Sequence, residues 1–357
     1  MTTAILFDDK FASGHLVRGI PEGPDRTAKV MSGLQESGLL ESTQLIIPKP
    51  VDLRILQLVH SAAYIEAVRS SCASRLPHVE FEQQVDPKRV WYDQVAADSN
   101  NLGELTPSAL LDLRRKIALG EQSSTPLAHD TYELGLLAAG AVVDACDKVM
   151  SAEVRNAFCV VRPPGHHAEY DAARGFCFFN NVAVGAAHLL NRYKLEKVLI
   201  IDVDVHHGNG AQHSFYESDQ VLVCNIHRTP SELYPGNCGF AKEMGAGKGL
   251  GFNLNIPLPG NSGSQVYLQS LALIERFAHI YKPQFVLLSF GVDAHEADRM
   301  GGMQLSTGFF GMMTEKIRMI ADRHTDGRMV SVFEGGYNRD VLGPCAVAHV
   351  KQLLKKD

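Results

Sequence analysis

Residues 198–210 read Val198-Leu199-Ile200-Ile201-Asp202-Val203-Asp204-Val205-His206-His207-Gly208-Asn209-Gly210. The stretch begins as a continuous apolar run, which is typical of a strand buried on both faces of a parallel sheet. It then changes abruptly to carboxylates and imidazoles, and the Gly-Asn-Gly at its end suits a tight turn into a following helix. Because residues two apart on a strand point to the same face, we expect Asp202, Asp204 and His206 to project together where the strand ends.

Two carboxylates and an imidazole gathered at one place need a positive partner. Side by side, these groups repel or desolvate one another unless something cationic lies between them. A divalent metal ion is the simplest such partner. The alternative is a carboxylate–histidine hydrogen-bond network that caps the strand, which would be the better interpretation if this were the only motif of its kind.

Three further apolar runs end in the same manner. They are followed by Arg162-Pro163-Pro164-Gly165-His166-His167, by Gly291-Val292-Asp293 and by Glu334-Gly335-Gly336-Tyr337. One such ending is ordinary, since Gly and Asp are common turn residues. Ligands of open α/β sheets bind outside the carboxyl ends of the strands, so four endings that supply a His pair, an Asp-x-His, an Asp and a Tyr predict an active site.

Apolar runs alternate with segments of helical pattern along the chain. The runs expected to form strands are near Ala4–Phe7, Gln44–Ile47, Ala157–Val161, Val198–Val203, Val221–Ile226, Phe252–Ile256, Phe285–Phe290 and Met329–Phe333. The expected helices cover Asp25–Ser37, Ser61–Ser71, Thr131–Met150, Asn180–Arg192, Ser264–His279, Thr307–His324 and Asp340–Lys355. This alternation predicts a three-layer α/β/α fold, in which helices cover both faces of a mostly parallel sheet of about eight strands.

At its motifs the chain resembles the zinc-dependent histone deacetylase and acetylpolyamine amidohydrolase family, and within it the class II-like bacterial branch. RPPGHH, GFCFFNN, DVDVHHGNG, GVD and EGGY occur in the family's order. The match runs from about Asp130 to the C-terminus, with weaker similarity at Pro21–Arg26. The resemblance implies an arginase/deacetylase-like fold and a deacetylase that hydrolyses the amide bond of an N-acetylated amine.

The resemblance also implies a ligand set for one catalytic zinc ion. Carried over by position, Asp204, His206 and Asp293 would ligate the metal, and Tyr337 would supply the hydroxyl that stabilises the transition state. A catalytic zinc takes three protein ligands and keeps one position open, which fits this set. Two carboxylates and one imidazole would also suit iron or cobalt. Asp293 alone could instead cap the segment after its strand.

The paired histidines have implied roles as well. His166 and His167 would be the general acid/base pair, with one accepting the proton of the attacking water and one protonating the leaving amine. Asp202 would orient His166, and Asn209 would lie behind His167. Asn209 stands where other members carry Asp; its amide accepts a hydrogen bond but carries no charge, so it would stabilise an imidazolium less.

Four residues are implied to shape a narrow tunnel for the substrate. Gly175 and Phe176 precede the family's Cys-x-x-Asn pattern, Tyr234 stands where Phe is frequent, and Met300 stands where a rim residue is often Leu. The alternative for Phe176 and Tyr234 is core packing. Polyamine-specialised members of one branch carry Glu at the position of Met300, so its absence here weakens a polyamine-specific interpretation.

The resemblance implies two further features. Arg26 resembles the arginine of an internal acetate-release channel, and Asp202, His206 and Asn225 resemble a structural potassium site. Asp293-Ala294-His295 mimics a second Asp-x-His pair, but because the ligand set is already complete we expect His295 at the rim of the pocket. Cys177 is expected to pack rather than to act as a nucleophile.

Composition limits the class of protein. The chain has 357 residues, 45% of them hydrophobic and 21% charged, with a net charge of −6, which fits one globular domain spanning residues 1–357. We see no signal peptide and no apolar run that could span a bilayer. Seven scattered cysteines without a Cys-x-x-Cys motif fit a reducing cytoplasm. The absence of basic runs argues against nucleic-acid binding.

Residues 76–124 depart from the alternating pattern. This segment contains the only Trp of the chain, in the pair Trp91-Tyr92. Connections of this length are usually functional or mobile, and such aromatic pairs are enriched at interfaces. We interpret the segment as an insertion that shapes the pocket entrance or makes a homodimer contact; the alternative is a passive solvated loop.

Three functions remain open at this point. The first is a metal-dependent deacetylase of acetyl-lysine in proteins or of small acetylated amines such as acetylpolyamines. The second is an arginase-like hydrolase with a binuclear manganese site, which would need more clustered Asp. The third is a catalytically silent acyl-lysine binding module, against which Tyr337 and the paired histidines argue.

Overall fold

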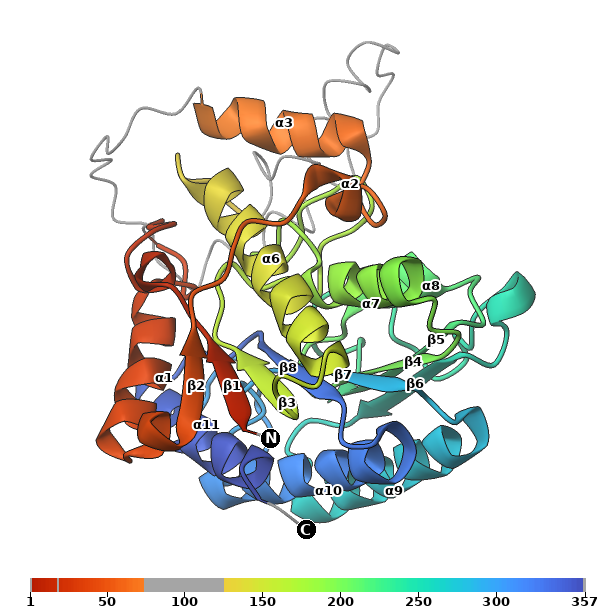
Figure 1. The fold of residues 1–357 in the computed structure, drawn as a ribbon. Coiled ribbons are helices and arrows are strands. Elements are labelled where there is room, and N and C mark those ends of the chain that lie inside the picture. The colour runs from red at the N-terminus through yellow and green to blue at the C-terminus, as the bar shows by residue number, and fades with distance from the viewer. Residues whose placement is uncertain (1, 18, 74–124, 356–357) are drawn as a thin grey trace.

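Figure 1 shows the computed structural model, which describes residues 2–17, 19–73 and 125–355. The strands are β1 (Thr3–Leu6), β2 (Thr43–Ile46), β3 (Asn156–Cys159), β4 (Val198–Asp202), β5 (Val221–Arg228), β6 (Asn253–Leu258), β7 (Phe285–Phe290) and β8 (Met329–Phe333). They form one sheet in the order β2-β1-β3-β8-β7-β4-β5-β6, and all neighbouring pairs are parallel. The predicted strands are confirmed, each within two residues of its expected ends.

The central strands are apolar because both of their faces are covered. Every residue of β4, β7 and β8 is buried. A strand of this kind has no solvated face, so its sequence shows a continuous apolar run instead of alternation. This explains why runs such as Phe285–Phe290 could be recognised without any period-two pattern.

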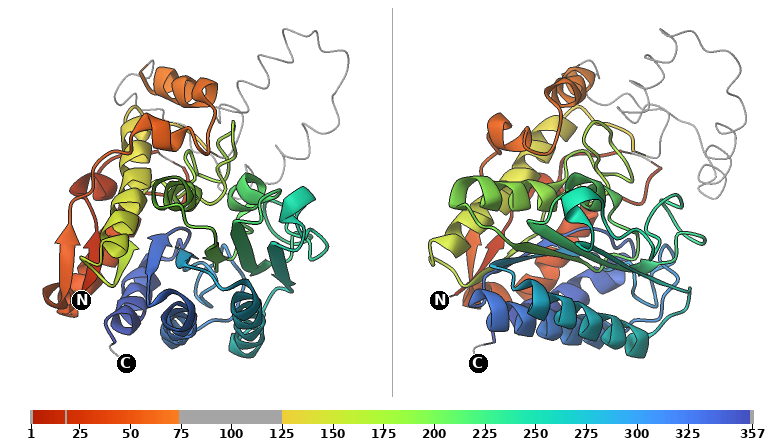
Figure 2. Two further views of the ribbon diagram at one scale, coloured as in Figure 1. Left: turned by 45° about the vertical axis from the view of Figure 1, so that its right-hand side comes forward. Right: turned by 90° about the vertical axis from the view of Figure 1, so that its right-hand side faces the viewer.

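Helices cover both faces of the sheet, which confirms the predicted three-layer fold. The helices are α1 (Asp25–Glu36), α2 (Leu53–Leu56), α3 (Ala62–Ala73), α6 (Thr131–Met150), α7 (Asn181–Tyr193), α8 (Asn209–Phe215), α9 (Ser264–Tyr281), α10 (Thr307–Thr325) and α11 (Arg339–Leu353). Figures 1 and 2 show α6, α7 and α8 on one face, and α1, α9, α10 and α11 on the other. In the same views α3 lies outside α6, on the side away from the sheet.

The shortest helical elements were not predicted from the sequence. The helices α2 and α8 span four and seven residues, and 3-10 helices cover Asp9–Ala12, Leu39–Ser42 and Gly247–Gly249. One or two turns are too short to show the helical period of apolar residues. The turn Gly208-Asn209-Gly210 does lead into a helix, as expected, since α8 begins at Asn209.

Two expectations remain, one on residues 76–124 and one on membrane-spanning helices. The interpretation of residues 76–124, including Trp91-Tyr92, falls outside the described residues. Among the described helices none has the length and apolar character needed to cross a membrane.

Candidate active site

The four motifs meet because their strands are neighbours. In the sheet β3, β8, β7 and β4 lie side by side, and all run in the same direction. Their carboxyl ends therefore lie at one edge, and the segments that follow them converge there. The His pair follows β3, Tyr337 follows β8, Asp293 follows β7, and Asp204 and His206 follow β4.

Asp204, His206 and Asp293 form a buried cluster with the spacing of a metal site. One ligand atom of each lies within 4.8 Å of the others. The Nδ1 atom of His206 is 3.1 Å from Asp204 Oδ1 and 3.1 Å from Asp293 Oδ2. All three side chains are almost completely inaccessible to solvent.

Backbone amides hold both carboxylates in place. Gly335 N–H donates to Asp204 Oδ2 at 2.7 Å, and Val205 N–H donates to Asp293 Oδ1 at 2.9 Å. A side chain at Gly335 would collide with both Asp204 Oδ2 and Asp293 Oδ2. Glycine at this position therefore keeps the space between the two carboxylates open.

The electrostatics of this cluster fit a bound cation. Burial and the charge of Asp204 raise the pKa of Asp293 to about 7. Burial disfavours protonation of His206, but its hydrogen bonds to Asp204 and Asp293 outweigh burial and raise its pKa to about 9. Two buried carboxylates thus hold one proton on the imidazole, and a divalent cation would neutralise them more completely. The donor set of two carboxylates and one imidazole fits such an ion.

Asp202 does not join this cluster, which corrects the expectation from the strand period. Regular strand structure ends at Asp202, so the alternation of faces does not extend to Asp204 and His206. Instead Asp202 Oδ2 lies 2.9 Å from His166 Nδ1, and Asp202 Oδ1 accepts from Asp204 N–H at 3.0 Å. Burial disfavours protonation of His166, but the charges of Asp202 and Asp204 outweigh it and raise its pKa to about 10.

His167 lies against His166 yet has the opposite electrostatic character. The ring centroids of the two histidines are 3.9 Å apart. Burial and the neighbouring charges of His166 and His206 hold the pKa of His167 well below its ordinary value. Its Nδ1 atom lies 2.7 Å from Asn209 Oδ1. One histidine of the pair therefore favours the charged form and the other favours the neutral form.

A narrow cavity opens beside the cluster and is lined by all four of the expected tunnel residues. Its volume is about 10 Å³, room for about one water molecule. The lining residues are His167, Gly175, Phe176, His206, Tyr234, Met300 and Tyr337.

The backbone at Gly175 and Phe176 is left-handed, with φ of 48° and 67°. A side chain at Gly175 would collide with the His167 ring, and a bulky residue in left-handed geometry is costly. This turn brings the Phe176 ring to 6.0 Å from that of Tyr337.

Asp298 supports Tyr337, a role that the sequence analysis missed. Asp298 Oδ2 accepts from the N–H groups of Tyr337 and Asn338 at 2.6 and 3.0 Å, and its Oδ1 accepts from Met300 N–H at 2.9 Å. One buried carboxylate therefore holds the backbone of two cavity-lining residues. The sequence around Asp298 does not indicate its contact with Tyr337 and Asn338, because these partners are backbone amides 39 and 40 residues away.

Arg26 lies behind Tyr337 in a buried ion network. Its guanidinium carbon is 4.9 Å from the centroid of the Tyr337 ring, and its Nε donates to Gly336 O at 2.7 Å. Glu22 lies 3.2 Å from Arg26 and 2.5 Å from Arg162. Glu22 and Arg162 were visible in the motifs but were not assigned a role, because an ion network linking positions 140 residues apart has no local signature.

Two other sequence expectations can be compared with the structure. His295 is not among the cavity-lining residues and is buried, so its placement at the rim was wrong. Its Nε2 pairs with Thr307 Oγ1 at 3.0 Å and its Nδ1 accepts from Ala297 N–H at 3.0 Å, which makes it a structural histidine. Cys177 is a buried thiol, and burial raises its pKa well above the ordinary value. A thiol that keeps its proton agrees with the expectation that Cys177 packs instead of acting as a nucleophile.

Two of the three residues of the expected potassium site, Asp202 and Asn225, lie together. Asp202 and Asn225 are directly paired between β4 and β5. A side chain at Gly208 would collide with Asp202 Oδ2 and approach Asn225 Oδ1 to 3.0 Å. The side-chain oxygens of Asp202 and Asn225 thus face the same small space.

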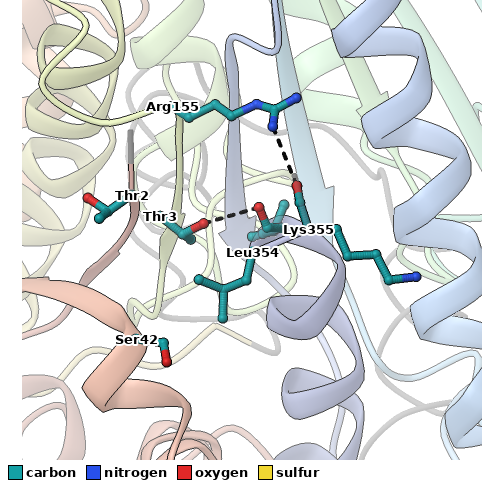
Figure 3. Close-up of a pocket in the computed structure, with 7 residues that line it drawn as sticks. Thr2, Thr3, Ser42, Arg155, Leu354 and Lys355 are labelled. Carbon is teal, nitrogen blue, oxygen red and sulfur yellow. Dashed lines mark hydrogen bonds between the residues drawn. The ribbon is translucent and has the colours of Figure 1, made fainter. Parts of the chain in front are cut away.

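A second cavity lies at the opposite end of the strands (Figure 3). Its volume is about 340 Å³ and it is lined by Thr2, Thr3, Ser42, Arg155, Leu353, Leu354 and Lys355. Thr3 Oγ1 donates to Leu353 O at 3.1 Å, and Arg155 donates to Lys355 O at 3.4 Å. Both hydrogen bonds attach the C-terminal residues to the rest of the fold. The lining contains no cluster of carboxylates or histidines.

Known proteins resemble the chain over nearly its full length. Residues 20–353 match the histone deacetylase domain. A "Probable deacetylase" of Archaeoglobus fulgidus is 32% identical over 95% of this chain and 82% of its own length. A "Histone deacetylase-like amidohydrolase" of Pseudomonas aeruginosa is 33% identical over 96% of this chain and 77% of its own. Human "Histone deacetylase 9" is 34% identical over 94% of this chain but 32% of its own length. The chain therefore belongs to the histone deacetylase family.

Proposed function

We propose that this protein is a metal-dependent amidohydrolase that removes acetyl groups from N-acetylated amines. The observation that carries the proposal is the convergence of two kinds of group on one cavity. Asp204, His206 and Asp293 form a buried ligand set, and His167 and Tyr337 line the adjoining space. A site built for binding alone needs neither the histidine pair nor the phenol.

The ligand set would hold one zinc ion. When bound, the ion would polarise the acyl carbonyl and acidify the attacking water. Asp204 accepts hydrogen bonds from the backbone N–H groups of Gly335 and His206, and Asp293 accepts one from Val205 N–H, so both carboxylates have a fixed direction. Iron or cobalt would satisfy the same donors.

The histidine pair would move the protons. His167 is held neutral, so its free ring nitrogen in the cavity wall can accept the proton of the attacking water. His166 faces the carboxylate of Asp202, which favours its charged form, so it would stabilise the negative charge that develops nearby. The acyl carbon forms a bond to the water oxygen and loses its bond to the amide nitrogen. The departing nitrogen takes a proton from one of the two histidines and leaves as a neutral amine.

Tyr337 would donate a hydrogen bond to the developing oxyanion. Burial raises the pKa of this phenol well above its ordinary value, so it keeps its proton and remains a donor. The backbone of Tyr337 is held by Asp298, and the ring lies against Phe176 and Arg26. A donor fixed in advance costs no reorganisation when the charge forms.

The lining of the cavity favours a thin, extended substrate over a bulky one. Phe176, Tyr234 and Met300 provide mainly apolar walls, which suit the alkyl chain of acetyl-lysine or of a small acetylated amine such as an acetylpolyamine. Behind the site, Arg26 offers a positive group on the path that we propose for the released acetate. Potassium held by Asp202, His206 and Asn225 would steady the loop after β4.

The competing functions are less well supported. A binuclear manganese site would need a further carboxylate beside Asp204 and Asp293. The neighbouring carboxylate of Asp202 pairs with His166 instead. A silent acyl-lysine reader would leave the histidine pair without a purpose. We also propose that residues 1–357 form one cytoplasmic domain, in which the insertion at 76–124 shapes the entrance or joins two copies.

Parallel rate measurements test the reaction and its substrate class. The zinc-loaded protein would be assayed for acetate release from an acetyl-lysine peptide and from a mono-acetylated diamine at equal concentration. We expect acetate release from at least one, and the ratio of kcat/KM identifies the preferred class. Absence of acetate release from both substrates by protein that holds stoichiometric zinc would contradict the proposed reaction.

A further inference from the structure

The two active-site histidines have different partners at Nδ1. His166 faces a carboxylate, since Asp202 Oδ2 lies 2.9 Å away. His167 faces an amide, since Asn209 Oδ1 lies 2.7 Å away. An amide oxygen accepts a hydrogen bond without carrying charge, and an amide can also present its NH₂ group instead. His167 therefore depends on whatever fixes the orientation of Asn209.

Two acceptors fix that orientation. Asn209 Nδ2 donates to His167 O at 3.1 Å and to Glu169 Oε1 at 2.5 Å. A carbonyl and an ionised carboxylate only accept, so the NH₂ group must face them and Oδ1 must face the imidazole. His167 Nδ1 then carries the proton, and its Nε2 is left as the base.

Glu169 is itself firmly held. Its backbone oxygen pairs with His60 Nδ1 at 2.8 Å, and its backbone N–H donates to Ala172 O at 2.9 Å. Its two carboxylate oxygens lie 2.9 and 3.0 Å from His213 Nδ1. His213 lies four residues after Asn209 on α8, so the two side chains share a helix face. The series His167–Asn209–Glu169–His213 thus leads from the cavity wall to the half-exposed surface.

We propose that Glu169 is a positioning residue for His167. Through Asn209, Glu169 fixes the tautomer of His167 that leaves Nε2 free. It also supplies a negative charge to His167, as Asp202 does to His166, but through Asn209 instead of by direct contact. The inference rests on the proposed deacetylase function, because the base is useful only if a water proton is to be removed there.

Glu169→Gln is the first variant. The glutamine amide at position 169 can donate as well as accept, so the orientation of Asn209 is no longer unique. His167 then loses its fixed tautomer. We expect kcat to fall by about 10-fold to 100-fold, the usual effect of losing a partner that orients an active-site ligand or base. KM should stay the same, since Glu169 is not among the residues that line the described cavity. Asp171→Asn, at an exposed carboxylate in the same loop, is the matched control and should match the wild type.

A double variant separates positioning from simple support of the loop. Asn209→Asp alone places a second carboxylate next to that of Glu169. The two negative charges repel each other, so this variant should also lower kcat. Combined with Glu169→Gln, the new aspartate can receive the glutamine NH₂ and face His167, which repeats the arrangement of Asp202 and His166. We expect the double variant to be faster than either single variant. Losses that merely multiply would overturn the proposal.

The tautomer can be read without any assay of activity. Long-range ¹H–¹⁵N correlation spectra of histidine-labelled, zinc-loaded protein, with His167→Ala to assign the signal, should show Nδ1–H at His167 in the wild type and the double variant. Glu169→Gln should show a mixture. An identical single tautomer in all three proteins would contradict the proposal. An inactive wild type would instead remove the proposed function, while the spectra would still decide the role of Glu169.

Discussion

The two ends of the parallel sheet carry cavities of opposite character. The cavity where the strands begin is the larger, about 340 Å³ against about 10 Å³, and it is lined mostly by neutral groups near the chain ends. The cavity where the strands finish is narrow, but buried carboxylates, histidines and a phenol surround it. Convergence of titratable groups with displaced pKa values, and not volume, distinguishes a site for chemistry.

The difference follows from the direction of the strands. Segments that leave the carboxyl ends of β3, β8, β7 and β4 gather at one edge, so four short motifs distant in sequence can contribute to a single site. At the other edge Arg155 is paired with Asp322 at 2.6 Å, which leaves no unbalanced charge in that pair. Substitutions at the two ends should therefore have very different effects.

The largest effect is expected from His206→Ala. Removing one of three ligands leaves an open, weak site, so metal occupancy and turnover should both be lost. Metal content would be measured by elemental analysis and turnover by acetate release. Ser42→Ala, in the lining of the opposite cavity, is the control and should retain both. Full metal content in His206→Ala would remove this residue from the ligand set.

Tyr337→Phe should have the next largest effect. Loss of one preorganised oxyanion donor lowers kcat by roughly 100-fold or more, while metal content and KM should be retained. Steady-state kinetics and elemental analysis on the same preparation check both parts. Unchanged turnover would show that the oxyanion is stabilised by another group.

Glu22→Gln should act on stability. The variant leaves Arg26 and Arg162 buried beside a neutral amide, and breaking a buried ion pair costs about 3–5 kcal/mol of unfolding free energy. Burial opposes ionisation of Glu22, but the charge of Arg162 outweighs it and lowers its pKa to about 2 from 4.5. A depressed pKa stabilises the fold above about pH 4.5, and this contribution is lost as the pH falls towards 2.

Urea unfolding at pH 6 and pH 3 checks this prediction. The difference in unfolding free energy between wild type and Glu22→Gln should be larger at pH 6 and smaller at pH 3. A difference that is the same at both values would mean that the Glu22 carboxylate does not carry the effect.

The smallest effect is expected from Arg155→Ala at the opposite end. Arg155 and Asp322 are partly exposed, and pairs of this kind contribute about 1 kcal/mol or less to stability. Turnover should be unchanged. Loss of turnover in this variant would mean that the larger cavity communicates with the chemistry, and the contrast between the two ends would fail.

The sequence predicted the fold well because buried parallel strands have a direct signature. The runs Phe285–Phe290 and Met329–Phe333 have the bounds that were expected from their apolar residues alone. The meeting of the segments that carry Asp204, His206 and Asp293 was also expected, since each segment follows such a run, and the family resemblance implied that these three residues form one set.

Interactions between distant positions could not be predicted in the same way. The turn of Asp202 towards His166 depends on where the strand stops, and the support of Tyr337 by Asp298 depends on backbone amides. The link from Asn209 to Glu169 is formed only once α8 packs beside the histidine-bearing loop. The pairing of Asp202 with His166 was implied by the family resemblance alone, and the partners of Asp298 and Glu169 were not predicted at all.

One titration tests the central claim most directly. Metal would be removed with a chelator and zinc added back stepwise, while bound zinc per chain and the rate of acetate release from an acetyl-lysine peptide or acetylated diamine are recorded on the same samples. We expect no activity without metal and a rate that rises in proportion to bound zinc and stops at one ion per chain. Full activity in the metal-free protein, or a rate that reaches its maximum only at two ions per chain, would contradict a mononuclear metal-dependent deacetylase.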